Sequence, residues 1–119
     1  MNTILVVDDE HFLRLLYERE LTEAGYQVEA VGDGNDALAA LERAPRDLVI
    51  LDIRMREGIP NGLMILNEIL KQNRGQKVIL NTAYASYMDE GASWLANGFV
   101  VKSADMTELK TKIREVLAT

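Results

Sequence analysis

The stretch Thr3-Ile4-Leu5-Val6-Val7-Asp8-Asp9-Glu10 carries the pattern that decides the fold, a short apolar run that stops abruptly at acidic residues. Comparable runs occur further along the chain at Leu48–Leu51, Val78–Leu80 and Phe99–Val101. Short runs that are almost continuously apolar are typical of strands covered on both faces of a sheet. Tyr26–Ala30 instead alternates apolar and polar residues, which predicts a half-solvated strand at the edge of that sheet.

Between these runs, apolar residues recur at the spacing of helices that bury one face. Gly25 suits the end of the first helix, and Pro45 stops the second. Asp105 and Glu108 resemble a capping box before the last helix. Strand and helix therefore alternate, which predicts a doubly wound α/β fold with parallel strands and helices on both faces. The predicted helices are Glu10–Ala24, Asn35–Ala44, Leu63–Gln72, Tyr84–Asn97, which has the weakest pattern, and Asp105–Ala118.

Composition and charge narrow the class of protein. A chain of 119 residues has the size of one domain, so we expect a single domain over residues 1–119. Zero cysteines and one histidine exclude a disulfide framework, a thiol nucleophile and a metal site made of several histidines. The net charge of −6 argues against direct nucleic-acid binding. Because no apolar run has membrane-spanning length and no signal-peptide pattern is present, we expect a cytoplasmic protein without membrane contact.

Residues able to do chemistry follow the predicted strands at the end where doubly wound sheets build their sites. Taken singly, each has an ordinary explanation as a solvated acid at a helix start, a strand-end hydroxyl or a surface lysine. Their arrival at equivalent strand ends favours a joint site, and clustered carboxylates suit Mg²⁺, a cation that prefers oxygen ligands. These residues are Asp8 and Asp9 after the first strand, Asp52 after the third, Thr82 after the fourth and Lys102 after the fifth.

Four segments carry a resemblance to a known family, namely Val6–Glu10, Leu48–Met55, Asn81–Ala85 and Phe99–Lys102. With them the chain resembles the receiver domain of two-component response regulators, over essentially its whole length. The resemblance implies a flavodoxin-like sheet of five parallel strands in the order 2-1-3-4-5.

The resemblance also implies a Mg²⁺-dependent phosphoryl transfer. Asp52 would be the phosphoacceptor, attacking the phosphohistidine of a partner kinase. Asp9 and Asp52 would bind Mg²⁺ directly, together with the backbone carbonyl of Arg54. Asp8 would act mostly through a metal-bound water. Such a transfer depends on positioning and charge neutralisation more than on covalent help from the protein.

The remaining family positions imply a switch. Thr82 and Lys102 would contact phosphoryl oxygens, and Phe99 stands where the family has its switch aromatic. The resemblance therefore implies a phosphorylation-switched regulator rather than an enzyme. Its expected partner is a sensor histidine kinase or a phosphotransfer protein, and a homodimer could form through the last helix and the fifth strand.

Three features depart from the family pattern. Ser103 follows Lys102 where a proline is usual, so we expect a trans bond there. The segment Met55–Gly62 is slightly longer than the usual turn. The span from Thr82 to Lys102 is slightly shorter, which predicts a truncated fourth helix.

Two other classes of function remain to be weighed. A pseudo-receiver would keep the fold without taking phosphate, but the complete set of site residues argues against it. An enzyme on this fold is disfavoured because Asp8-Asp9-Glu10 would repel a flavin phosphate, and the Asp-x-Asp pattern of aspartate-nucleophile phosphatases is absent after the first strand. The sequence does not identify the kinase or the output.

Overall fold

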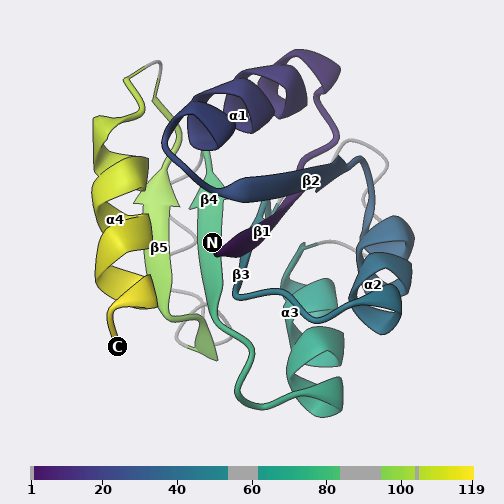
Figure 1. Ribbon diagram of the computed structural model, residues 1–119. Helices are drawn as coiled ribbons and strands as arrows, with labels where there is room; N and C mark the ends of the chain where they lie inside the picture. The colour runs from purple at the N-terminus through teal and green to yellow at the C-terminus, as the bar shows by residue number, and fades with distance from the viewer. Residues whose placement is uncertain (1, 54–61, 84–94, 104) are drawn as a thin grey trace.

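The chain folds into one parallel sheet with helices on both of its faces (Figure 1). The computed structural model describes residues 2–53, 62–83, 95–103 and 105–119. The strands follow the predicted order, β2-β1-β3-β4-β5. No helix in these ranges is long and apolar enough to cross a membrane. The elements are β1 (Thr3–Val7), α1 (His11–Glu23), β2 (Gln27–Val31), α2 (Gly34–Arg43), β3 (Leu48–Leu51), α3 (Gly62–Gln72), β4 (Val78–Thr82), β5 (Gly98–Val101) and α4 (Thr107–Leu117).

Burial separates the central strands from the edge strands. Nearly every residue of β1, β3 and β4 is buried, as their continuous apolar runs predict. The β2 strand is half-buried, which confirms the edge position predicted for Tyr26–Ala30. In Phe99–Val101, which the sequence predicts to be covered on both faces, Phe99 packs against one core layer and Val100 lies in the other. Since β5 is the other edge of the described sheet, it is only partly buried, with Val100 its one fully buried residue.

Alternation along the strands divides the core into two layers. One layer joins side chains such as Leu5, Leu51 and Leu80 to α2 and α3. The other joins Ile50, Ile79 and their neighbours to α1 and α4. Figure 1 shows the same grouping, with α2 beside α3 and α4 beside β5. Both faces are thus covered, so the chemistry is left to the ends of the strands.

The helix boundaries follow the predicted signals, with one correction. Gly25 has a φ of +102° just beyond the end of α1, the conformation that favours glycine after a helix. The residue before Pro45 is extended, which ends α2. The predicted capping box at Asp105 and Glu108 is wrong, because α4 has Met106 as its N-cap and no side-chain cap. Asp105 lies one residue too early, and its Oδ1 accepts from the N–H of Thr107 at 2.9 Å.

Most of the predicted helix Tyr84–Asn97 lies outside the described residues. Its last three residues, 95–97, are described and lead into β5 without forming an α-helix.

Candidate functional site

The carboxyl ends of the strands bring the predicted site residues together. The backbone ladder continues past the strands: the N–H of Asp52 donates to the carbonyl of Val7 at 3.0 Å. In the same way, the N–H of Lys102 donates to the carbonyl of Thr82 at 2.7 Å. Asp8 follows β1 directly. Because parallel strands end at the same edge, these side chains meet although they are far apart in the sequence.

Lys102 is the centre of this cluster. Its Nζ lies 2.7 Å from Asp8 Oδ2 and 3.0 Å from Asp52 Oδ2. All three side chains are largely buried, with exposed fractions of 13% for Lys102, 2% for Asp8 and 5% for Asp52. Such short, shielded contacts make charge-assisted hydrogen bonds, which are stronger than neutral ones.

Opposing effects set the pKa of Lys102. Burial of the ammonium lowers this pKa, but the hydrogen bond that Lys102 donates to Asp8 and the negative charges of Asp52 and Asp8 outweigh that effect. The net result is a pKa raised well above the ordinary lysine value. Lys102 is therefore a permanent positive charge at neutral pH, placed between two carboxylates.

Asp9 completes an acidic cluster. Asp8, Asp9 and Asp52 each offer a carboxylate oxygen, and these oxygens all lie within 4.8 Å of one another. The N–H of Glu10 donates to Asp8 Oδ1 at 2.9 Å, which fixes that carboxylate. Three carboxylates against one ammonium leave an excess of negative charge in a mostly buried place. The donor set fits a hard divalent cation such as Mg²⁺, which oxygen ligands bind preferentially.

The other predicted residues have different outcomes. Thr82 is fully buried at the end of β4. Phe99 is half-buried, pairs with Leu80 in the sheet and packs against the core layer under α2 and α3. The backbone carbonyl of Arg54, predicted as a metal ligand, lies outside the described residues.

The sequence reasoning missed Arg14 and Gly62 beside the site. Arg14 Nη1 donates to the backbone carbonyl of Asp8 at 2.7 Å and so ties α1 to the end of β1. At Gly62, a Cβ would collide with the backbone carbonyl of Asp52 and with the Cα of Ile53. Glycine alone allows α3 to begin against the segment that carries Asp52. A glycine directly before the predicted helix was the available signal.

A second missed feature is the contact between Tyr17 and Asn81. Asn81 Nδ2 donates to the hydroxyl of Tyr17 at 3.0 Å, and both side chains are buried. The signal in the sequence was an amide directly after the apolar run Val78–Leu80.

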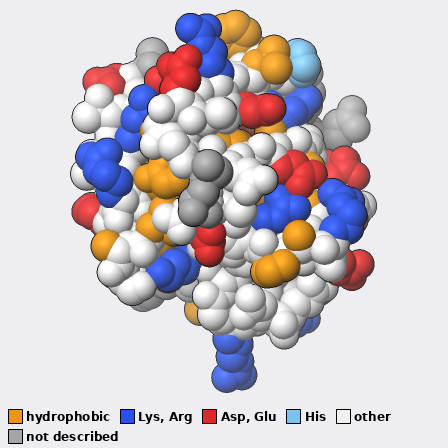
Figure 2. Space-filling view, viewed as in Figure 1, with side chains coloured by type: hydrophobic (Ala, Val, Ile, Leu, Met, Phe, Trp, Pro, Cys, Tyr) orange, Lys and Arg blue, Asp and Glu red, His pale blue; other side chains and the backbone are white. Residues whose placement is uncertain are grey.

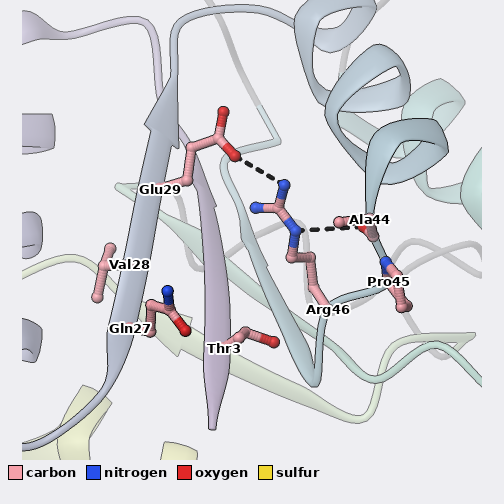
Figure 3. A pocket seen from close by; sticks show the side chains of 7 residues that line it. All are labelled: Thr3, Gln27, Val28, Glu29, Ala44, Pro45 and Arg46. Atoms are coloured by element: carbon pink, nitrogen blue, oxygen red, sulfur yellow. Dashed lines mark hydrogen bonds and ion pairs between the residues drawn. The ribbon is translucent and has the colours of Figure 1, made fainter. Parts of the chain in front are cut away.

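A cavity lies at the opposite end of the sheet (Figure 3). It has a volume of about 330 Å³ and lies between the starts of β1 and β2 and the end of α2. Arg46 points across it, pairing with Glu29 at 2.7 Å and donating to the carbonyls of Ala44 and Ala40. These contacts satisfy the last carbonyls of α2, a structural task.

Comparison with known proteins gives the same picture. A family model described as the response regulator receiver domain matches residues 4–114. The probable transcriptional regulatory protein TcrX of Mycobacterium tuberculosis is 33% identical over 117 residues, which cover 97% of this chain and 49% of TcrX. The response regulator ArlR of Staphylococcus aureus is 35% identical over 119 residues, which cover 98% of this chain and 53% of ArlR. The chain thus spans about half the length of these curated relatives.

Among solved structures, the response regulator TrrA of Thermotoga maritima is similar over nearly the whole chain. Its complex with Mg²⁺-BeF superposes with a TM-score of 0.92 at 44% identity, covering 98% of this chain and 99% of TrrA. TrrA in complex with the histidine kinase ThkA superposes with a TM-score of 0.90, at the same identity and coverage.

Proposed function

This chain belongs to the family of response regulator receiver domains, and we propose that it accepts a phosphoryl group on Asp52 from a phosphohistidine and switches a binding surface in response. The observation that carries this proposal is the position of Lys102, whose ammonium lies between Asp8 and Asp52 in a buried acidic cluster. This arrangement concentrates charge around one carboxylate at the edge of a sheet that is otherwise covered. We place the reaction in the cytoplasm, as the sequence predicts.

The transfer itself requires little covalent machinery. A carboxylate oxygen of Asp52 forms a bond to phosphorus while the bond between phosphorus and the histidine nitrogen breaks. The electron pair of the broken bond stays with the imidazole, which takes a proton from solvent. The product on this chain is an acyl phosphate. Catalysis then depends on holding the reactants in line and on neutralising charge.

Each cluster residue has a role in this proposal. Lys102, already 3.0 Å from Asp52, neutralises charge on the incoming phosphoryl oxygens. Thr82 donates its hydroxyl to a phosphoryl oxygen. Asp9 and Asp52, with Asp8 and the backbone carbonyl of Arg54, would hold Mg²⁺, which supplies further charge neutralisation. The donor set of three carboxylates supports this assignment.

The partner in this proposal is a histidine kinase or a phosphotransfer protein, since TrrA was solved in complex with a kinase. The surface next to the site suits such a partner. Phe12 and Leu15, three residues apart on α1, are exposed by 76% and 54% and give this surface an apolar part. Figure 2 shows hydrophobic side chains beside the histidine on the surface over α1. We propose that the partner docks there, with its phosphohistidine over Asp52.

The switch follows from the added charge. A phosphoryl group brings roughly −1.5 to −2 charges and new acceptor oxygens, which draw the Thr82 hydroxyl inward. A shift of Thr82 reaches β5 and Phe99, because β4 and β5 are paired in the sheet. The surface made by β5 and α4 is therefore the proposed output surface, for a second copy or for a downstream partner.

Beryllofluoride, which mimics an acyl phosphate on carboxylates, tests the proposal together with Mg²⁺. We expect amide shifts at Asp52, Thr82 and β5 when both are added to the wild-type protein. The variant Asp9→Asn is the matched control, because it removes a metal ligand and leaves Asp52 in place. A wild-type protein that shows no Mg²⁺-dependent response and takes no phosphoryl group from acetyl phosphate would be a pseudo-receiver.

A further inference from the structure

Two polar side chains are buried together between α1 and β4. Tyr17 is 3% exposed and Asn81 is 2% exposed, and the amide of Asn81 donates to the hydroxyl of Tyr17 at 3.0 Å. Burying an amide and a phenol is unfavourable unless they bond to each other or to another partner. A strand with the run Val78–Leu80 could have continued with another apolar residue at this place. The pair therefore supplies a directional hydrogen bond between α1 and β4, which an apolar core contact would not supply.

The position of the pair follows from the alternation of side chains in the sheet. Asn81 lies on the same face of β4 as Ile79, and it pairs with Val100 on β5. Ile79 and Val100 both belong to the core layer under α1 and α4, which also contains Tyr17. One further alternation step beyond Val100 reaches Lys102, on the same face.

The acids lie on this face as well. Val6 and Ile50 belong to the same core layer, and one alternation step further along β1 and β3 gives Asp8 and Asp52. The charged cluster is thus the last layer of this face. The register of β3 and β4, which pairs Leu51 with Leu80, places Asn81 beside Asp52, so the pair of Tyr17 and Asn81 lies next to the acids on this face.

The electrostatics of Tyr17 agree with this placement. Burial raises the pKa of its hydroxyl, the hydrogen bond from Asn81 lowers it, and the charges of Lys102, Asp8 and Asp52 all act on it. The phenol therefore lies within electrostatic reach of Lys102, Asp8 and Asp52.

We propose that Tyr17 and Asn81 are positioning residues for phosphoryl transfer, holding Thr82 and Lys102 in place from beside the acids. Asn81 precedes Thr82, and the carbonyl of Thr82 accepts the N–H of Lys102 at 2.7 Å. The directional hydrogen bond from Asn81 to Tyr17 on α1 therefore fixes the backbone that carries both Thr82 and Lys102. An apolar pair could fill the same volume, but it could not fix this direction.

This inference rests on the proposed function, and its test separates the two. The test follows phosphorylation by acetyl phosphate with Mg²⁺ in the wild type, in Tyr17→Phe and in the double variant Tyr17→Phe/Asn81→Leu. Urea unfolding of each protein measures stability in parallel. The matched control is Tyr26→Phe, which removes the same hydroxyl at the start of β2. A wild type that takes no phosphoryl group defeats the proposed function, whereas the comparison among active proteins decides the positioning role.

We expect Tyr17→Phe to lower the maximal rate by about tenfold to a hundredfold, because small misplacements of reacting groups have effects of this size. The concentration of acetyl phosphate at half-maximal rate should change little, and Tyr26→Phe should react at the wild-type rate. Replacing both polar partners with apolar ones restores stability in many proteins. The double variant should therefore recover stability but not rate. A double variant with the wild-type rate would show that the pair serves packing alone.

A measurement on the wild type keeps the proposal testable if a variant does not fold. The ¹³Cζ resonance of Tyr17 reports the hydrogen bond of its hydroxyl. We expect it to shift when beryllofluoride and Mg²⁺ are added, while the ¹³Cζ resonance of Tyr26 stays unchanged. A Tyr17 resonance that does not move, while Asp52 and Thr82 respond, would overturn the proposal.

Discussion

The two ends of the sheet each hold a cluster of ionised side chains, and the clusters have opposite compositions. At the carboxyl end, one cation, Lys102, contacts two acids, Asp8 and Asp52, at 2.7 and 3.0 Å. At the amino end, one acid, Glu29, contacts two cations: Arg46 at 2.7 Å (Figure 3) and Arg43 at 3.1 Å.

The two clusters differ in burial and in net charge. Glu29 and Arg43 are exposed by 39% and 62%, so water screens their attraction. Arg46 is mostly buried, but its guanidinium also donates hydrogen bonds to the carbonyls at the end of α2. At the carboxyl end, Asp8 and Asp52 are buried and Lys102 is largely so, and the half-buried Asp9 adds a further negative charge. A mostly buried cluster with an excess of negative charge suits a divalent cation, whereas the solvent-screened cluster holds an edge strand against a helix.

The largest contrast is expected for Asp52→Asn. The amide keeps the shape of the side chain but removes the nucleophilic oxygen, so uptake of a phosphoryl group from acetyl phosphate should be lost. Glu29→Gln makes the same chemical change at the amino end and should leave uptake intact. Intact mass after incubation, with hydroxylamine treatment to remove acyl phosphate, measures both variants. If Asp52→Asn carried hydroxylamine-labile phosphate at the wild-type yield, the nucleophile would lie elsewhere.

Removing the central cation should have the largest effect on stability. In Lys102→Met, Asp8 and Asp52 lose a buried partner, and breaking a buried ion pair from one side costs about 3–5 kcal/mol. Urea unfolding near neutral pH without Mg²⁺ measures the loss. A change below about 1 kcal/mol, the usual value of an exposed pair, would mean that this cluster is screened like the amino-end one.

The same variant gives a prediction for pH. The pKa of Lys102 is raised in the folded protein above its ordinary value of 10.5. A group with a raised folded pKa stabilises fully below the unfolded value and loses that effect as pH rises towards the folded one. The stability difference between wild type and Lys102→Met should therefore hold up to about pH 10 and shrink above it. A difference that stays constant beyond that pH would contradict the proposed origin.

The contrast also explains what could be predicted from the sequence. The strand order was predictable from the resemblance to the receiver family. The meeting of Asp8, Asp52 and Lys102 was predictable because parallel strands place the residues that follow them at one edge. The partial burial of β5 was not apparent from its residues, since an apolar run does not reveal how many neighbours a strand has.

The supporting contacts were beyond sequence reasoning for a different reason. Arg14 and Tyr17 both look like ordinary residues of an amphipathic helix. Their roles depend on how α1 lies over the sheet, which decides that one reaches the carbonyl of Asp8 and the other the amide of Asn81. Such contacts depend on how the helices and strands pack against one another, and the spacing of apolar residues along a helix carries no information about that packing.

A glycine tests the packing at the carboxyl end. Gly62→Ala would push a methyl group into the backbone of Asp52, and forcing extra atoms into a packed site costs about 1–3 kcal/mol. Gly75→Ala, near the amino end of β4, is the control, because its Cβ would meet the side chain of Asn73 at an ordinary distance of 3.5 Å. Stability against urea and the phosphorylation rate should both fall for Gly62→Ala. Both should stay near their wild-type values for Gly75→Ala. Equal behaviour of the two variants would show that α3 can withdraw from Asp52.

The smallest effect is expected at the exposed arm of the amino-end cluster. Arg43→Ala removes a contact of 3.1 Å to Glu29, but both side chains are solvated, and such pairs contribute about 0.2–1 kcal/mol. Arg46→Met should cost more, about 1.5–3 kcal/mol, because it removes hydrogen bonds from a charged group that is largely shielded. Neither variant should alter the phosphorylation rate, since both residues lie at the opposite end of the sheet. A slower rate in Arg46→Met at unchanged stability would mean that the two ends are coupled through β1 and β2, and the division into a structural and a reactive end would then be wrong.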